Sequence, residues 1–570
     1  MRELAGKLLA RLPLQFRILY RQFLLRVVDL EALSIEADIP RFLGQFAGIL
    51  IMFSLVHAAA LDVFFLKMPW YFEQYLITTE MLVAGLITVI CWDSTFPDRR
   101  DVMVLSPLPL GTRTILFAKV AASATLLGLA VVTLNCASGI MCPSLLATQL
   151  GSGWRFFQSF AAYWFTMVAA SLFIYCAVLT VQGLIALLLP RRLFLRLSAL
   201  LQLGAFGLFL GAYFLQPSFE TPATFAAPEN QWLLASSPSF WFFGLFNQLN
   251  GSLPTNLAWL ALRAWIGLAV VIFGAVTSLL LCYLRTMKKT VEEPDIVPGA
   301  HGWHWTPHFG DALETAIVLF SIRSLTRSRH HRVAFAFYLS LVLALALSSV
   351  KVSLSAATFR PVTADFLIAT FLMMSLAVGG LRSVFSLPIS LNANWVLRTT
   401  QLCPSQKYIA ATRKSLLILA VVPVWMLSAA LMLPMRPLLQ VAGHLVVLAL
   451  LGSILVDLSL IGFYKVPFTC SYLPGKVNIQ FVLWGSFFVF AILAIPSVGY
   501  EMGALHDSLQ FAWMTIFLGA AAVGLWVFNR HRAKSAVIYF EELPPEIITT
   551  LGLTQPLSSA GEPKQGPSVL

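Results

Sequence analysis

The sequence predicts an all-helical protein that crosses a membrane about twelve times, as two parallel repeats of six spans. Of its 570 residues, 58% are hydrophobic and only 11% are charged, compared with about 45–50% and about 25% in soluble globular chains. The mean hydropathy is +0.81 in a chain of 62.8 kDa, which is too apolar for a surface that faces water. The third observation is a series of long apolar runs. Together these features exclude an ordinary soluble enzyme.

Twelve apolar runs of about 20 residues qualify as spans, because a helix of that length crosses a hydrocarbon core about 30 Å thick. They cover approximately residues 42–64, 74–93, 114–141, 160–189, 193–215, 257–284, 333–350, 363–387, 411–433, 437–464, 477–499 and 507–529. Only Leu189-Pro190-Arg191-Arg192 separates the fourth run from the fifth. The count of twelve is therefore defined to within one span.

The basic residues predict the orientation. With both termini in the cytoplasm, the outer segments hold six of the 38 Lys and Arg residues, namely Lys67, Arg155, Arg263, Lys351, Arg360 and Arg436. An odd number of spans would move the basic groups at 191–196, 285–289, 323–332 and 398–414 outside, against the positive-inside rule. The net charge of +12 therefore reflects topology and not nucleic-acid binding. We expect an integral protein of the plasma (inner) membrane.

The N-terminal segment predicts an amphipathic helix on the cytoplasmic membrane surface. No short apolar core with a small-residue cleavage site follows the first residues, so a cleavable signal is not indicated. Between residues 14 and 34, one side of the helix carries Arg17, Arg21 and Gln22, and the other carries Phe16, Leu19, Tyr20 and Phe23. Such a helix buries its apolar side at the headgroup level. The alternative is a solvated leader segment.

The two halves of the chain correspond at an offset of about 290–295 residues, as a search for internal repeats shows. Pro109 lies ten residues before Lys119 at the start of the third span, and Pro404 lies ten residues before Lys414 at the start of the ninth. A basic lead-in also recurs, because the segment 320–327 precedes the seventh span. Since six is even, the halves share one orientation, which predicts a pseudo-twofold axis along the membrane normal and a cavity between the halves.

This organisation divides the chain into five parts. Residues 1–40 form a cytoplasmic amphipathic connecting helix, 41–287 the first transmembrane half, 288–312 a polar cytoplasmic linker, 313–529 a lead-in helix with the second half, and 530–570 a cytoplasmic tail with a disordered end. The halves differ outside the membrane, because the outer loop at 216–256 is long and aromatic and its equivalent, 498–506, is short. We expect the long loop to lie partly in the interface, with its rings at the headgroup level, and the alternative is a gate or substrate-release element.

The sequence carries no catalytic motif. It contains no G-x-x-x-x-G-K-[ST] phosphate loop, no G-x-G-x-x-G after a strand and no H-E-x-x-H. The seven cysteines include no close pair, and the nine histidines have no carboxylate or thiolate at ligand spacing. We therefore predict no catalytic residue, no metal and no directly bound cofactor. The chain is not predicted to be an enzyme by itself.

Ionisable residues inside spans are costly and mark candidate functional sites. The intramembrane candidates are Glu80 in the second span, Asp457 and His444 in the tenth, and His57 and Asp62 in or beside the first. In a proton-coupled carrier, such carboxylates would alternate between protonated and paired states at mid-membrane. The structural alternative is that Glu80 and Asp457 face the interior and hydrogen-bond to a neighbour such as Asn135, or stay neutral through desolvation.

The cytoplasmic loop between the second and third spans is the most informative segment. It contains, in order, Asp98, Arg99, Arg100 and Asp101, then Leu105-Ser106-Pro107-Leu108-Pro109, and then Arg113 and Lys119 at the start of the third span. The pattern predicts a short helix across the membrane surface, whose polar side can press on a soluble partner. Pro107 and Pro109 would fix the angle at which the chain leaves this helix.

This loop resembles the intracellular coupling segment of type-2 ABC exporter permeases. That pattern is an acid, an apolar stretch, Leu-Ser-x-Leu-Pro, polar residues including Arg, and Ala-Lys at the start of the third span; residues 105–109 and 113–119 fit it. In the second half, residues 386–390 and 401–414 match more loosely and lack the acidic residues. The lead-in helix and the aromatic outer loop resemble the family's connecting helix and extracellular helical hairpin.

The resemblance implies a permease subunit in which two six-span bundles form the translocation pathway. A separate soluble ABC ATPase subunit, present twice, would dock on the lead-in helices and loops, so that ATP is bound by the partner. The implied coupling residues are Asp98, Arg99, Arg100, Asp101, Pro107, Pro109, Arg113, Lys119, Pro404, Lys407 and Lys414. The other partner is the lipid bilayer, and the substrate would move outward or laterally from it.

Three other functions stay open. A proton-coupled secondary transporter explains the span count and the repeat, but it does not explain the lead-in helices and predicts more intramembrane charge. A membrane-embedded transferase acting on a lipid-linked substrate would need acidic residues in the outer segments, and those available are isolated along the chain, namely Asp62, Glu73, Glu220, Glu229, Asp365, Glu501 and Asp507. A structural subunit could recruit a partner through the segment 539–546.

Overall fold

The chain folds as an assembly of helices. The computed structural model describes residues 13–28, 39–64, 69–92, 105, 108–150, 153–215, 230–292, 307–354, 362–389, 405–432, 435, 437–469 and 494–538. Within these ranges every regular element is a helix and no strand occurs. Eight helices are long and apolar enough to cross a membrane, and four shorter apolar helices accompany them. This confirms an all-helical, polytopic membrane protein, while twelve spans in two repeats stays a prediction.

The first helix set comprises the elements from α2 to α14. Their bounds are α2 (Leu14–Val28), α3 (Ile39–Phe64), α4 (Pro69–Ile90), α7 (Thr112–Leu134), α8 (Ser138–Leu150), α9 (Gly153–Leu188), α10 (Arg191–Phe214), α12 (Gln231–Ser236), α13 (Pro238–Asn250), the 3-10 turn η2 (Thr255–Leu257) and α14 (Ala258–Glu292). α14 therefore continues into the segment predicted as the linker.

The second helix set comprises the elements from α15 to α23. Their bounds are α15 (Ala312–Arg327), α16 (Arg329–Leu354), α17 (Ala364–Val384), α19 (Ser405–Leu416), a π-helical turn (Leu417–Val421), α20 (Val422–Met432), α21 (Leu438–Ser459) and α23 (Ser508–Ser535). A further helical segment covers residues 494–504. Most of the predicted eleventh span, together with the tail from 539, lies outside the described residues.

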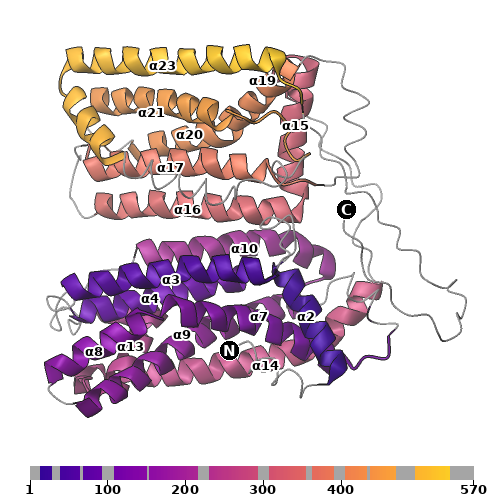
Figure 1. Ribbon diagram of the computed structural model, residues 1–570, viewed down its shortest axis with the longest axis vertical. Helices are drawn as coiled ribbons and strands as arrows, with labels where there is room; N and C mark the ends of the chain where they lie inside the picture. The colour runs from indigo at the N-terminus through magenta and orange to yellow at the C-terminus, as the bar shows by residue number, and fades with distance from the viewer. Residues whose placement is uncertain are drawn as a thin grey trace, which may run out of the picture.

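The long helices run side by side, and the short helices α2 and α15 lie across the same end of them (Figure 1). We call this the lead-in end. The amphipathic N-terminal helix is present as predicted, since α2 packs on α7 with Leu19 and Phe23 buried while Arg21 and Gln22 are exposed. Its outer side is not purely polar, because Leu14 and Ile18 are also exposed.

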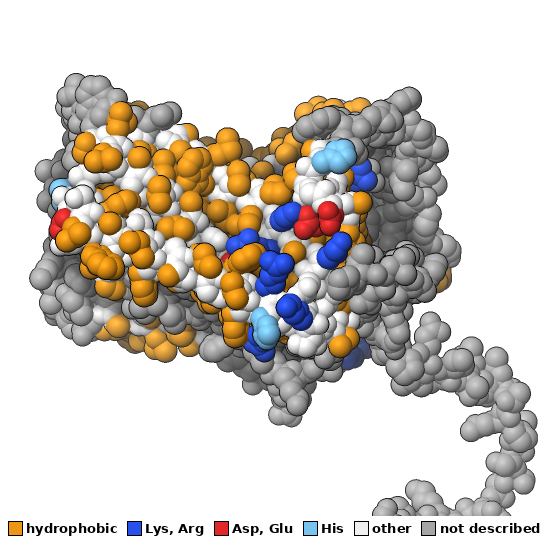
Figure 2. Space-filling view, turned by 90° about the horizontal axis from the view of Figure 1, so that it is seen from above, with side chains coloured by type: hydrophobic (Ala, Val, Ile, Leu, Met, Phe, Trp, Pro, Cys, Tyr) orange, Lys and Arg blue, Asp and Glu red, His pale blue; other side chains and the backbone are white. Residues whose placement is uncertain are grey.

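Burial identifies the helices that face lipid. α23 and α14 lie at opposite edges of the molecule (Figure 1), and only 11% and 17% of their apolar windows are buried, compared with 72% for α4. Figure 2 shows that the face over α23 is mainly hydrophobic and that Lys and Arg side chains gather toward the lead-in end. The last turn of α23 contributes Arg532 and Lys534 to this end. An apolar band with basic residues at one end is the pattern that a bilayer imposes.

Two predicted spans are interrupted helices. The third span was expected at 114–141, but α7 ends at Leu134 and α8 begins at Ser138 after a three-residue turn. The ninth contains the π-helical turn at 417–421, followed at once by Pro423 inside α20. Proline lacks a backbone N–H, so the local helix must rearrange its hydrogen bonds.

The expectation that the aromatic rings of the 216–256 loop lie at the headgroup level is wrong for its second part. Residues 238–250 form α13, which packs against α9, α14 and α4. Phe240, Phe242 and Phe243 are fully buried there. A helix that can pack these rings into the bundle gains more buried apolar contact than one on the surface. Trp232, in the preceding short helix α12, is 71% exposed.

The predicted orientation can be tested at the two ends of α23. Ser508 and Ser535 are both exposed, so Ser508→Cys and Ser535→Cys form a matched pair. In sealed right-side-out membrane vesicles, we expect a membrane-impermeant maleimide to label the variant at 508 and to label the variant at 535 only after permeabilisation. The unaltered chain, with its seven cysteines, gives the background. Labelling at 535 in sealed vesicles would mean that the orientation is inverted.

Candidate functional site

The first candidate site is the contact between the lead-in helix α2 and the start of α7. The ammonium group of Lys119 lies 5.2 Å from the centroid of the Phe23 ring, and Lys119 is only 3% exposed. Tyr20 and Thr125 share a hydrogen bond of 2.9 Å between their hydroxyl groups. A buried cation over an aromatic face is stabilised by the ring quadrupole. Lys119 therefore holds α2 on α7 and is not exposed to a soluble partner.

The corresponding contact in the second helix set combines apolar packing with ion pairs. Asp311 caps α15 and forms a capping box with Glu314, so both carboxylates lie at the start of the helix. Lys407, on α19, forms an ion pair of 3.3 Å with Asp311. Lys414, two helical turns later, forms an ion pair with Glu314 and donates to the Phe309 carbonyl at 3.3 Å. Two predicted coupling lysines thus hold α15 on α19.

Arg413 connects α19 to α21. It donates from Nε and Nη2 to the two carboxylate oxygens of Asp457, at 2.8 and 2.9 Å, and from Nη2 to the hydroxyl of Ser453 at 3.0 Å. Asp457 is fully buried and lies in the last turn of α21, which ends at Ser459. Asp457 therefore lies near one end of its helix and joins α21 to α19. Sequence reasoning missed Arg413. A basic residue at the start of one span and an acidic residue at the end of the next could have indicated this ion pair.

The start of the second coupling loop is also held by the chain itself. The segment 385–389 and the segment after α21 exchange backbone hydrogen bonds, from Phe468 N to Phe385 O at 2.9 Å and from Ile389 N to Phe468 O at 3.0 Å. Phe468 is buried with φ +66°, a conformation uncommon for a non-glycine residue. His331 approaches the Leu387 carbonyl at 2.9 Å. These contacts fix the end of α17.

The predicted coupling residues differ in whether the structure describes them and in how exposed they are. Asp98, Arg99, Arg100, Asp101, Pro107 and Pro404 lie outside the described residues. Pro109 and Arg113 are exposed at the lead-in end, just before and within the first turn of α7. Lys119 is buried against α2, whereas Lys407 and Lys414 are partly exposed and are ion-paired to α15.

The second candidate site is the polar cluster around Glu80, which is 2% exposed. Its Oε2 accepts from the Asn135 amide at 2.6 Å and its Oε1 accepts from the Ser171 hydroxyl at 2.5 Å. The predicted bond to Asn135 is therefore confirmed. The Tyr163 hydroxyl donates to Asn135 Oδ1 at 2.7 Å. Asn135 belongs to the turn between α7 and α8, so the interruption of the third span places its amide against Glu80.

Two further buried polar contacts are present. One joins α13, which precedes α14, to the first helix set, and the other joins the helical segment 494–504, which precedes α23, to the second. In the first set, Glu73 on α4 accepts from the amide of Asn247 on α13 at 3.1 Å. In the second, His444 on α21 lies 2.7 Å from the carboxylate of Glu501 and 2.9 Å from the hydroxyl of Thr370. Two of the acidic residues predicted for the outer segments, Glu73 and Glu501, thus each bond to a side chain from another helix. Sequence reasoning missed both pairs because their partners are far apart in the chain.

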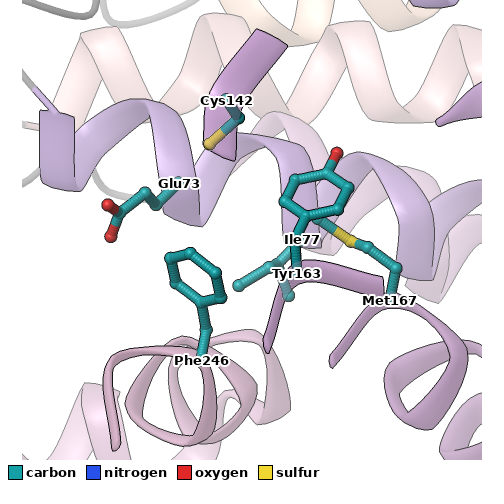
Figure 3. Close-up of a pocket in the computed structure, with 6 residues that line it drawn as sticks. All are labelled: Glu73, Ile77, Cys142, Tyr163, Met167 and Phe246. Carbon is teal, nitrogen blue, oxygen red and sulfur yellow. The ribbon is translucent and has the colours of Figure 1, made fainter. Parts of the chain in front are cut away.

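A small cavity lies inside the first helix set and is lined by Glu73, Ile77, Cys142, Tyr163, Met167 and Phe246 (Figure 3). Its volume of about 10 Å³ admits about one water molecule, so the cavity is no substrate chamber. Figure 3 shows the carboxylate of Glu73 pointing away from Ile77 and Tyr163. Among the described residues, no three His, Cys, Asp or Glu side chains gather as they would around a metal ion.

Comparison with known proteins gives no relative: no family model matches the sequence, and neither a curated protein nor a solved structure matches the chain. Function is therefore inferred from the residues and contacts of this chain.

The Arg413–Asp457 pair predicts a large stability effect. Asp457→Ala leaves a partly buried guanidinium without its partner, which we expect to lower the free energy of unfolding by about 3 kcal/mol. Lys407→Ala is the matched control, because the side chains of Lys407 and Asp311 are 49% and 67% exposed and such a pair contributes about 0–1 kcal/mol. Thermal unfolding in detergent micelles measures both. Equal melting temperatures for the two variants would contradict the assignment.

The hydrogen bonds of Glu80 predict that three substitutions lower the stability by different amounts. Glu80→Leu removes the acceptor of two buried donors, and we expect a loss of about 2 kcal/mol in the free energy of unfolding. Glu80→Gln keeps one acceptor oxygen and should lose less, and Ser171→Ala should lose least because Asn135 stays bonded to Glu80. The same thermal unfolding assay ranks the three variants. A leucine variant as stable as the unaltered chain would show that these hydrogen bonds do not stabilise the first helix set.

Proposed function

We propose that the chain is the membrane-spanning permease subunit of an ATP-driven ABC exporter. It would form the translocation pathway and couple to a separate soluble ATPase subunit. The observation that carries this proposal is the pair of short helices across one end of the molecule (Figure 1). Each packs on the start of a long helix that follows a predicted cytoplasmic loop, α2 on α7 and α15 on α19.

The lysines at these contacts support a division into two equivalent halves. Lys119 and Lys414 are 295 positions apart in the sequence, close to the offset of the predicted repeat. Lys119 contacts Phe23 of α2, and Lys414 contacts Glu314 of α15. Each half would therefore use a lysine at the start of its third span to hold its own lead-in helix.

The described end of the first coupling loop packs with the lead-in helix. Leu105 and Leu110 of the loop pack against the cluster formed by Leu19 and Phe23 of α2 with Ile115 of α7 and its neighbours. Apolar side chains packed in this way resist separation, because the contact is close and water is excluded. A partner that presses on the loop or on α2 would therefore displace the start of α7.

The sequence itself indicates where ATP chemistry would reside. It has no phosphate loop, so nucleotide would bind to the ATPase partner, present once for each lead-in helix. The exposed Pro109 and Arg113, with the charged segment 98–101, would contact that partner. Lys407 and Lys414 would instead position α15, because both are ion-paired to it.

A proton-coupled transporter is a less well supported alternative. Both carboxylate oxygens of Glu80 already accept hydrogen bonds, and both oxygens of Asp457 are bonded to Arg413. A coupling carboxylate needs a second arrangement in which it releases such partners. The alternative also gives the lead-in helices no role.

Purification of the tagged chain from its native membranes in mild detergent tests the proposal. We expect a soluble protein with a Walker phosphate loop to co-purify in near-stoichiometric amount, identified by mass spectrometry. Replacing Arg99, Arg100 and Asp101 together by Ala should reduce its recovery, because the variant cannot form charge-assisted hydrogen bonds with the partner at these positions. Arg530→Ala with Arg532→Ala is the control, since these residues are exposed at the same end of α23. A chain that purifies alone, under conditions that preserve a comparable complex, would refute the proposal.

A further inference from the structure

The two helix sets meet along α10 and α16, which lie side by side between them (Figure 1). We call this contact the seam. At its centre Phe206 of α10 and Phe337 of α16 pack edge to face, with ring centroids 5.8 Å apart. Val89 of α4 and Ala336 of α16 complete the buried core, in which Val89 and Phe206 are not exposed at all. The seam is an apolar and aromatic contact.

The helices that form the seam carry no charge along most of their length. No Asp, Glu, Lys or Arg occurs between residues 197 and 215 of α10, or between residues 333 and 350 of α16. Ser340 is fully buried and donates to the backbone carbonyl of Leu203 at 3.3 Å. Its hydroxyl is therefore already used in joining the two helices.

Gln202 supplies an unused polar atom beside the seam. It lies one turn before Phe206 on the same face of α10, is 1% exposed, and its side-chain oxygen has no hydrogen-bond partner. An unpaired buried acceptor is costly and is satisfied when a donor arrives. An unpaired acceptor in a largely apolar contact fits a molecule with a hydrogen-bonding head and a hydrocarbon body.

The two candidate intramembrane carboxylates lie away from the seam. Glu80 is bonded inside the first helix set, and Asp457 is bonded inside the second. In a transporter made of two similar halves, the substrate passes at the interface between them. If the chain is a permease, its pathway is therefore the apolar seam and not the polar clusters.

We infer that the transported molecule is an amphiphile with a hydrocarbon chain, a lipid or lipid-like compound, that passes along the seam between α10 and α16 as the two helix sets separate. This inference rests on the proposed function. An acyl chain enters such a path at little cost, because lipid tails and apolar side chains are equally apolar. An oligosaccharide or a charged peptide would leave its polar groups without partners, at a cost of several kcal/mol for each group.

Photo-crosslinking from the seam tests this inference. Phe206 is replaced by the photoreactive residue p-benzoylphenylalanine, and the chain with its ATPase is placed in phosphatidylcholine vesicles. The probes are phosphatidylethanolamine with a fluorescent acyl chain and fluorescent maltoheptaose. Because Phe206 is fully buried at rest, we expect an adduct with the lipid probe that appears on illumination with ATP, disappears without ATP, and is absent for the sugar probe.

Two control positions define the background. The photoreactive residue at Phe273, which is 72% exposed on α14, should capture the lipid probe with or without ATP. At Phe240, fully buried in the core of the first helix set, it should capture neither probe. Phe337 is only partly buried and provides a second seam position if the substitution at Phe206 prevents folding.

The outcomes separate this inference from the proposed function. A sugar adduct at the seam overturns the inference, and so does the lack of an ATP-dependent lipid adduct at both seam positions. If the co-purified partner still hydrolyses ATP in that case, the proposed permease function stands. Absence of any ATPase partner overturns both. An ATP-dependent lipid adduct at the seam that is reduced by Gln202→Leu supports the inference in full.

Discussion

No water is available inside a bilayer to satisfy a polar group, and this constraint determines how the described helices are joined. Each buried carboxylate bonds to a side chain from a different segment: Glu73 to Asn247, Glu80 to Asn135 and Ser171, Asp457 to Arg413, and Glu501 to His444. An unpaired buried charge costs several kcal/mol. These bonds therefore determine which helices lie next to each other, which apolar packing alone would not do. They hold α13 to α4, the α7–α8 turn to α4 and α9, and α19 to α21.

Both lead-in helices are held by apolar packing, and two ion pairs add to the contact of α15. α2 rests on α7 through Leu19 and Phe23, with Lys119 over an aromatic ring. α15 rests on α19 through apolar packing of Ile317 with Tyr408 and Ala411, and also through two ion pairs whose lysine side chains are 49% and 42% exposed. Exposed ion pairs weaken as salt screens them, whereas apolar packing does not. Of the two contacts, the one in the first half is therefore the less sensitive to ionic strength.

The sequence predicted the features that depend on local composition. The helix at 14–28, the long apolar helices and the bond from Glu80 to Asn135 follow from periodicity, run length and the rule that buried acids need donors. The turn at 135–137 and the π-helical turn at 417–421 did not follow, because an apolar run reads the same whether its helix is continuous or broken. The partnerships of Arg413 and His444 depend on which helices become neighbours, and that information is tertiary.

The distribution of polar interactions indicates how the molecule can move. Polar side-chain bonds join helices within each set, whereas the described packing between the sets at Phe206 and Phe337 is apolar and is accompanied by the hydrogen bond from Ser340 to the Leu203 carbonyl. Breaking a buried hydrogen bond or ion pair has a large cost, whereas apolar side chains that part at the seam can pack against lipid chains instead. If the chain is a permease, each set would move as a unit and the seam would be where the sets separate. Force applied at the lead-in end would then open the molecule along α10 and α16, leaving Glu80 and Asp457 with their partners.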